Sequence, residues 1–142
     1  MSAILSTQNL VKKYGYKIVS NNISLTINKG DIYGFVGKNG AGKTTFMRQV
    51  LGLAFPDSGE ITLFGGEPLN TARKKIGSLI EFPSIYKNCT AYENMKRMAI
   101  LTGSSDKSVR KILDFVGLGN TGNKKAGQFS LGMRQRLGIA YS

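Results

Sequence analysis

Hydrophobic and polar residues alternate without interruption from residue 22 to residue 28. A period of two is the pattern of a strand that buries one face, so this segment predicts a half-buried strand. Lys29 and Gly30 then predict a turn. The apolar run at residues 32–36 is short and almost continuous, which favours a strand buried on both faces of a sheet.

Helical spacing of apolar residues comes next, in residues 46–51, and Gly52 ends this predicted helix. The sequence Pro-Asp-Ser-Gly at residues 56–59 predicts a turn. Residues 60–64 and 76–80 then predict two further short strands.

The pattern becomes helical from Thr90 onward, with a second helical segment after Ser105. Ser105 is suited to the N-cap of that segment, and Gly117 to its end. Residues 117–127 hold four glycines, two asparagines and two lysines, and so predict a loop. This order of elements predicts an α/β domain that carries a small helical subdomain.

Composition narrows the class of protein. A chain of 142 residues, 41% of them hydrophobic, suffices for one packed domain. Cys89 is the single cysteine and the chain has no histidine, which excludes an internal disulfide, a thiol–imidazole pair and a Cys/His metal cluster. No apolar run reaches the length of a membrane span, and residues 1–8 lack the basic and apolar regions of a secretory signal, so we expect a cytosolic protein.

The net charge of +12 raises the question of a nucleic-acid or acidic-lipid partner, because basic surfaces attract polyanions. The basic residues are scattered in ones and twos, with one triplet at residues 73–75, and no aromatic residues alternate with them to stack on bases. Solvated surface charge is therefore the simpler interpretation, and nucleic acid is not an expected partner.

One octet, at residues 37–44, carries the most specific chemistry. It satisfies the phosphate-loop pattern G-x-x-x-x-G-K-[ST] in full with Gly37, Lys38, Asn39, Gly40, Ala41, Gly42, Lys43 and Thr44. The octet stands between a predicted buried strand and a predicted helix, which is the arrangement the mechanism requires. The alternative, a glycine-rich turn with an incidental lysine, does not explain that context.

Each fixed position of this P-loop has a physical reason. Glycines adopt backbone conformations closed to other residues and let main-chain N–H groups turn toward phosphate oxygens. The following helix adds its N-terminal dipole. Lys43 supplies a positive charge for the β- and γ-phosphates, Thr44 a hydroxyl for Mg²⁺, and Thr45 a contact near the α-phosphate. The predicted ligand is ATP with Mg²⁺.

Residues 129–140 resemble the signature helix of ATP-binding-cassette (ABC) ATPases, whose usual core is Leu-Ser-Gly-Gly-Gln. Ser130 and Gly132 match that core, whereas Phe129, Leu131 and Met133 depart from it. Ser130 is also suited to be an ordinary helix N-cap, and the two roles are compatible.

Two further positions strengthen the resemblance. Tyr14 stands ahead of the P-loop, where this family places an aromatic ring that stacks on adenine; the alternative is a core or interface tyrosine. Residues 75–81 look like the segment leading into the family's Q-loop, with Glu81 in place of glutamine. Glu81-Phe-Pro and Ser130-Leu-Gly-Met are similar to the exporters that protect bacteria from lantibiotics and bacitracin.

The resemblance implies a fold and a set of partners. It implies a P-loop NTPase core, at residues 31–88, with an N-terminal antiparallel β part, at residues 1–30, and a helical subdomain with the signature helix, at residues 89–142. It implies an ATPase that pairs head to tail with a second ATP-binding subunit in a homodimer and works with membrane-spanning permease subunits at the inner face of the cell membrane. Glu81, as a catalytic and metal-binding residue beside Lys43, would alter the coupling to Mg²⁺ more than the affinity for ATP.

The family also requires an apolar strand ending in Asp, an adjacent Glu as general base and a later histidine, and none of these occurs in the 142 residues. We therefore expect a cassette that is incomplete at its C-terminus and binds ATP with slow turnover.

Three alternatives stay open. One is a soluble ABC-type ATPase that acts on the ribosome or on nucleic acid. Another is a P-loop GTPase or small-molecule kinase, although Ala126 cannot accept the guanine hydrogen bonds that the Asp of an Asn-Lys-x-Asp motif accepts. The third is a remnant without function.

Overall fold

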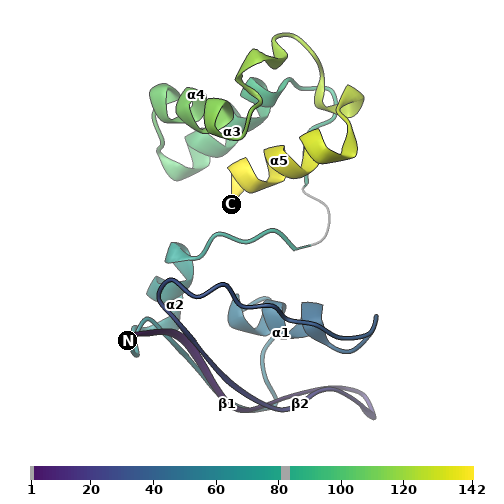
Figure 1. Ribbon diagram of the computed structural model, residues 1–142, viewed down its shortest axis with the longest axis vertical. Helices are drawn as coiled ribbons and strands as arrows, with labels where there is room; N and C mark the ends of the chain where they lie inside the picture. Colours follow the sequence, from purple (N-terminus) through teal and green to yellow (C-terminus); the bar gives the residue numbers. More distant parts are fainter. Residues whose placement is uncertain (1, 81–83) are drawn as a thin grey trace. The chain divides into compact units, whose positions relative to one another are not determined.

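The structure is a computed structural model that describes residues 2–80 and 84–142 (Figure 1). The chain divides into two compact units, Met1–Ile76 and Gly77–Ser142. The first unit contains a sheet, the P-loop and its helix. The second is helical and contains the signature segment.

A three-stranded antiparallel sheet forms the base of the first unit, in the order β2-β1-β3. Its strands are β1 (Ala3–Tyr14), β2 (Lys17–Asn28) and β3 (Ser58–Leu63). In the central strand Leu5 is paired with Ile27 on one side and with Leu63 on the other. The predicted strands at residues 22–28 and 60–64 correspond to parts of β2 and β3.

Helix α1 (Lys43–Val50) lies along one face of this sheet, as Figure 1 shows, and the short elements α2 (Leu69–Ala72) and η1 (Arg73–Lys75) follow β3. One face of α1 is apolar because Phe46 and Val50 are four residues apart. Together with residues of the sheet and α2 they make the core of this unit, which consists of Leu10, Phe46, Val50, Leu63 and Ala72. This packing sets the place where the P-loop enters α1.

Two predicted strands are wrong: residues 32–36 and 76–80 form no β-strand. An extended segment becomes a strand only when a neighbouring strand accepts its hydrogen bonds, and no strand within residues 2–80 and 84–142 is paired with either segment. Ile32 and Val36 are fully exposed. Phe35 packs on the core of this unit, where its ring stacks on Phe46 with 4.9 Å between ring centroids, and Ile76 of the second segment packs against the same core.

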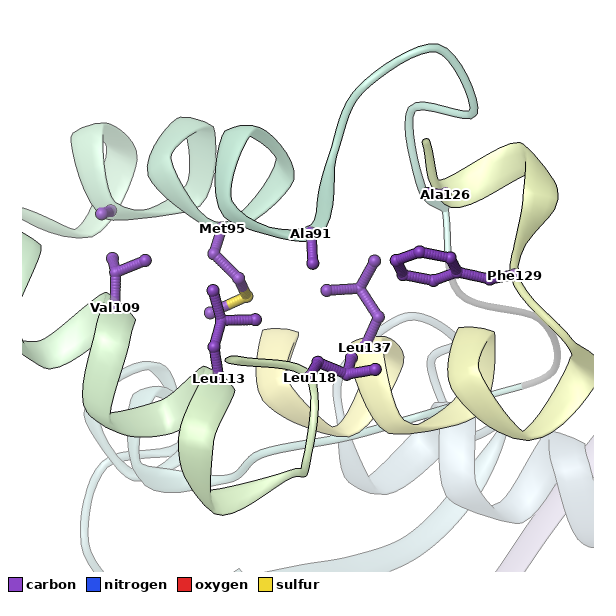
Figure 2. Packing of buried hydrophobic residues seen from close by; sticks show 9 residues of the cluster. Ala91, Met95, Val109, Leu113, Leu118, Ala126, Phe129 and Leu137 are labelled. Carbon is purple, nitrogen blue, oxygen red and sulfur yellow. The ribbon is translucent and has the colours of Figure 1, made fainter. Parts of the chain in front are cut away.

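The second unit packs three helices around one apolar cluster. They are α3 (Ala91–Thr102), α4 (Asp106–Phe115) and α5 (Leu131–Tyr141), with the single turns η2 (Gly119–Thr121) and η3 (Ala126–Gln128) between the last two. In Figure 2, Met95 of α3 points toward Leu113 of α4, and Leu137 of α5 lies beside the Phe129 ring. The predicted helical segments and the loop at residues 117–127 agree with this arrangement.

Helix ends in this unit are capped, at Ser105 and Gly117 as predicted and also at Thr90. The Ser105 side chain accepts a hydrogen bond from the backbone N–H of Ser108 at 3.2 Å, which begins α4. Thr90 and Glu93 form a capping box at the start of α3. The backbone N–H of Thr90, and then the ammonium of Lys125, lower the pKa of the Glu93 carboxyl. Gly117 follows α4 with φ of 70°, a conformation that suits glycine.

A buried amide, Asn94 of α3, connects three segments of the second unit. Its side-chain NH₂ donates to the carbonyl oxygens of Tyr86 at 3.0 Å and Thr90 at 2.8 Å, with a longer bond to Cys89. Its oxygen accepts from the Tyr86 N–H at 2.8 Å and from the Tyr141 hydroxyl at 3.1 Å. Asn94 is completely buried, so these bonds have no competition from water.

Candidate nucleotide-binding site

The P-loop leads directly into α1, and Gly42 is the N-cap of that helix. Gly42 accepts the first helical hydrogen bond, from Phe46 N–H at 2.8 Å, and has φ of 88°. Within the loop the N–H of Ala41 donates to the Lys38 carbonyl at 3.1 Å. The octet therefore has the loop-to-helix geometry that presents unpaired N–H groups to an anion.

Gly42 is enclosed by the neighbouring strand. A Cβ atom added at this position would lie 2.1 Å from the backbone carbonyl oxygen of Val19 in β2. No real Cβ approaches an oxygen so closely, so glycine is required by space as well as by φ. Val19 is a site residue that sequence reasoning missed, since no motif marks a strand residue by its carbonyl.

Lys43 reaches back over the loop. Its ammonium donates hydrogen bonds to the carbonyl oxygens of Gly37 at 2.5 Å and Lys38 at 2.8 Å. Carbonyl oxygens orient the ammonium without neutralising it, and a phosphate that carries full negative charge would be a stronger partner. The positive charge is thus placed over the loop where an anion would be bound.

A cavity of about 290 Å³ opens at this loop. Its lining brings together most of the predicted ligand residues and adds the strand residue already noted, and it consists of Val19, Asn39, Gly40, Gly42, Lys43, Thr44 and Thr45. Gly37 takes part through its carbonyl, and Ala41 through its N–H. Within residues 2–80 and 84–142, no acidic side chain belongs to this lining. The cavity therefore combines a cation, helix N–H groups and hydroxyls, which suits a polyphosphate and a hydroxyl-bound Mg²⁺.

Tyr14, the predicted adenine-stacking residue, ends β1 and is 52% exposed. The Lys12 ammonium lies 5.3 Å from the centroid of its ring. Tyr14 does not belong to the lining of the cavity at the P-loop. The role of Tyr14 in stacking on adenine stays a prediction.

The predicted signature residues belong to the second unit. Ser130 is the N-cap of α5, and its Oγ accepts from the Met133 N–H at 3.2 Å. Gly132 is exposed, and a Cβ added there would meet nothing within 4 Å. Glu81, the predicted metal-coupling residue, lies outside the described residues.

Comparison with known proteins decides the family. The sequence pattern of the family described as ABC transporter matches residues 20–142. The chain belongs to this family. The resemblance drawn from the P-loop and the signature segment is confirmed, and so is the fold class, an ABC ATPase-like α/β domain.

The relatives also support the resemblance to peptide-antibiotic exporters. The chain is 49% identical to the bacitracin transport ATP-binding protein BcrA of Enterococcus faecalis, over 99% of this chain and 47% of that protein. It is 46% identical to the lantibiotic transport ATP-binding protein SrtF of Streptococcus pyogenes, over 98% of this chain and 61% of that protein. The chain thus spans about half to three-fifths of the length of these relatives.

Solved structures agree on the fold. The ATP-binding cassette MJ1267 superposes with a TM-score of 0.80 at 26% identity, covering 98% of this chain and 64% of that one. CbiO1 from Clostridium perfringens, described as part of the complex cbiONQ, gives a TM-score of 0.83 at 24% identity, covering 99% of this chain and 61% of that one. The antiparallel sheet, the P-loop helix and the helical unit of this ABC domain are therefore a known combination.

Proposed function

We propose that this ABC-family chain binds the triphosphate of Mg-ATP at its P-loop and serves as the ATP-binding subunit of an exporter of peptide antibiotics. The observation that carries the proposal is the cavity at the start of α1, with the Lys43 ammonium held over the loop. Thr44 would ligate Mg²⁺, and Tyr14 would stack on adenine. The names of the two relatives favour export over the alternative of a soluble ABC ATPase acting on the ribosome.

The assembly we propose is a head-to-tail homodimer. Ser130 and Gly132 are exposed at the N-terminus of α5, where N–H groups face solvent and could bind the γ-phosphate of a nucleotide held by Lys43 of the second copy. No helix within the described residues has the length and apolar character needed to cross a membrane. We propose that membrane-spanning permease subunits supply the translocation path and hold the ATPase at the inner face of the cell membrane.

Turnover by the 142 residues alone should be slow. ATP hydrolysis needs a general base near the attacking water and a carboxylate on Mg²⁺, and the chain contains neither an adjacent Asp-Glu pair nor a histidine. We therefore propose nucleotide binding, rather than efficient hydrolysis, as the property of this chain in isolation.

Replacing Lys43 with alanine tests the proposed site. Loss of a charged hydrogen-bond donor to phosphate is expected to weaken Mg-ATP binding at least about tenfold, measured with a fluorescent ATP analogue. Lys29→Ala is the matched control, because Lys29 is an exposed turn residue and the same charge is removed. If Lys43→Ala bound Mg-ATP like the parent chain, the proposal would fail.

A second test concerns Glu81, whose role we propose from the sequence alone. An ionised carboxylate is a stronger ligand for a hard cation than an amide, so Glu81→Gln should raise the Mg²⁺ concentration needed for half-maximal binding of ATP by a few-fold. Metal-free binding should stay unchanged. Glu60→Gln, at an exposed position of β3, is the control. Identical Mg²⁺ titrations for Glu81→Gln and the parent would exclude the metal role.

A further inference from the structure

Helix α1 is tied to the sheet by a buried amide, Gln49. Its side chain is completely buried. The Ser20 hydroxyl of β2 donates to the Gln49 side-chain oxygen at 3.2 Å, and the Gln49 NH₂ donates to the Val11 carbonyl of β1 at 3.4 Å. One side chain thus connects the P-loop helix to two strands at once.

This amide stands at a position where an apolar residue would suffice for packing. Phe46, one turn earlier, and Val50 beside it are both core residues. A polar group at such a place is tolerated only when its hydrogen bonds are made, because leaving it unpaired is costly. Compared with a leucine, the amide adds directionality, because its two hydrogen bonds can both form in only one placement of the helix end.

Arg73 fixes the same end of the helix from the other side. Its guanidinium donates to the carbonyl oxygen of Val50 at 2.9 Å and to that of Gln49 at 3.3 Å. The end of a helix leaves such carbonyls without an intrahelical partner, and the Gln49 carbonyl also accepts from the Gly52 N–H at 3.1 Å. Both the side chain and the carbonyl of Gln49 are therefore held.

The strand that receives Gln49 also forms the wall of the P-loop. Ser20 directly follows Val19, whose carbonyl lies against Gly42 at the start of α1. An eight-residue helix is about 12 Å long and moves as a rigid body. A shift at its C-terminal end therefore changes the direction of the N–H groups at its N-terminus.

We propose that Gln49 is a positioning residue for phosphate binding: by joining α1 to Val11 and Ser20, it aims the N-terminus of the helix at the bound triphosphate. This inference rests on the proposed nucleotide-binding function. It predicts that nucleotide affinity follows the hydrogen-bonding state of residue 49, although Gln49 is not one of the residues that line the cavity at the P-loop.

Gln49→Glu allows that state to be switched by pH. A neutral carboxyl keeps both bonds, because its carbonyl oxygen accepts from Ser20 and its hydroxyl donates to the Val11 oxygen. An ionised carboxylate has no donor and would repel that oxygen. Its pKa should lie above the ordinary value of about 4.3, because burial disfavours the charged form.

The charged groups near residue 49 come from two elements. The Arg73 guanidinium packs against the end of α1. Lys12 and Asp57 lie at the same end of β1, where the Asp57 N–H donates to the Val11 oxygen at 2.9 Å. The backbone N–H of Lys13 and the Lys12 ammonium hold the pKa of the Asp57 carboxyl below its ordinary value. The chain has no histidine.

The experiment measures the Kd of a fluorescent ATP analogue with Mg²⁺, for Gln49→Glu and the parent chain, from pH 5 to pH 8.5. The ratio of the two Kd values should be near one at the lowest pH and rise to about tenfold above the glutamate's pKa. Met47→Glu is the matched control, because it places the same charge on an exposed position of α1; its ratio should stay flat. A role in stability alone would change the unfolding curve but not the Kd of the folded chain.

Two further measurements keep the outcomes distinct. Gln49→Met, which keeps the shape and removes both bonds, should bind the analogue several-fold more weakly at every pH; an unchanged Kd there, or a flat ratio for Gln49→Glu, overturns the inference while ATP binding stands. If the parent chain bound no analogue, the proposed function would fail. In that case, hydrogen exchange of the backbone amides of residues 42–46 tests the positioning role of Gln49. Protection from exchange that falls with rising pH in Gln49→Glu, but not in the parent chain, supports this role. Equal protection in the two proteins overturns it.

Discussion

Replacing Gly42 with alanine should abolish Mg-ATP binding. Gly42 has φ of 88°, which costs a non-glycine residue about 1–2 kcal/mol. The added Cβ would also lie 2.1 Å from the Val19 carbonyl oxygen, and neither the strand nor the helix N-terminus can move away without opening the P-loop. We expect affinity for the ATP analogue to fall more than about a hundredfold, since both effects act on the loop that holds the phosphates.

Gly40→Ala separates the two effects. Gly40 also has a positive φ, of 80°, but a Cβ at that position would meet nothing within 4 Å. Only the backbone strain applies, so a loss of about tenfold is expected. Circular dichroism of both variants checks that the sheet and helices persist. Equal losses for Gly40→Ala and Gly42→Ala would show that the Val19 carbonyl does not shape the site.

The P-loop could be predicted from the sequence because its chemistry is local. Eight consecutive residues specify the glycine conformations, the cation and the helix that follows, and the structure places five of them, together with Thr45, around one cavity. The signature segment is local in the same way, since Ser130 both matches the family pattern and caps α5. Residues that act together within one contiguous motif leave a pattern that can be read along the chain.

The strand predictions failed for segments in which strand formation depends on pairing with a neighbouring strand. Residues 32–36 and 76–80 have the composition of buried strands, but a strand depends on a partner that its own sequence does not specify. The opposite case is β1, where the residue pattern predicted no strand and only the family resemblance implied an antiparallel β part at residues 1–30. Its pairing shifts register between Thr7 and Leu10, and Asn9 has φ of 46°, so the alternation of polar and apolar residues is broken.

Buried amides were missed for a related reason. Gln49 and Asn94 look like ordinary polar residues of a helix, and only their partners distinguish them. Gln49 finds Ser20 at a separation of 29 residues, and Asn94 finds Tyr141 at 47. Periodicity places such residues on a helix, but it cannot show that the face they occupy is the buried one.

Removing the Asn94 side chain should produce the largest loss of stability in the second unit. Asn94→Ala deletes five side-chain hydrogen bonds and leaves the Tyr86 N–H without the partner that it has in this structure. A buried unsatisfied group costs about 1–3 kcal/mol, and a cavity adds to that. We expect a loss of about 3 kcal/mol or more in the free energy of unfolding, and a thermal midpoint lowered by more than about 10 °C.

Two companion variants show whether the hydrogen-bond network, rather than α3 itself, carries this effect. Tyr141→Phe removes one neutral hydrogen bond to Asn94 and should cost about 1 kcal/mol. Ile100→Ala lies on the same helix at an exposed position and should change the free energy of unfolding by less than about 0.5 kcal/mol. The order Asn94→Ala, Tyr141→Phe, Ile100→Ala follows from the burial and bonding of each side chain.

If Asn94→Ala unfolded at the same temperature as Ile100→Ala, the segment at Tyr86–Thr90 would be held by its backbone bonds alone. The exchange of the Tyr86 amide would then be unchanged by the substitution, whereas an active network predicts that it is the first amide to lose protection.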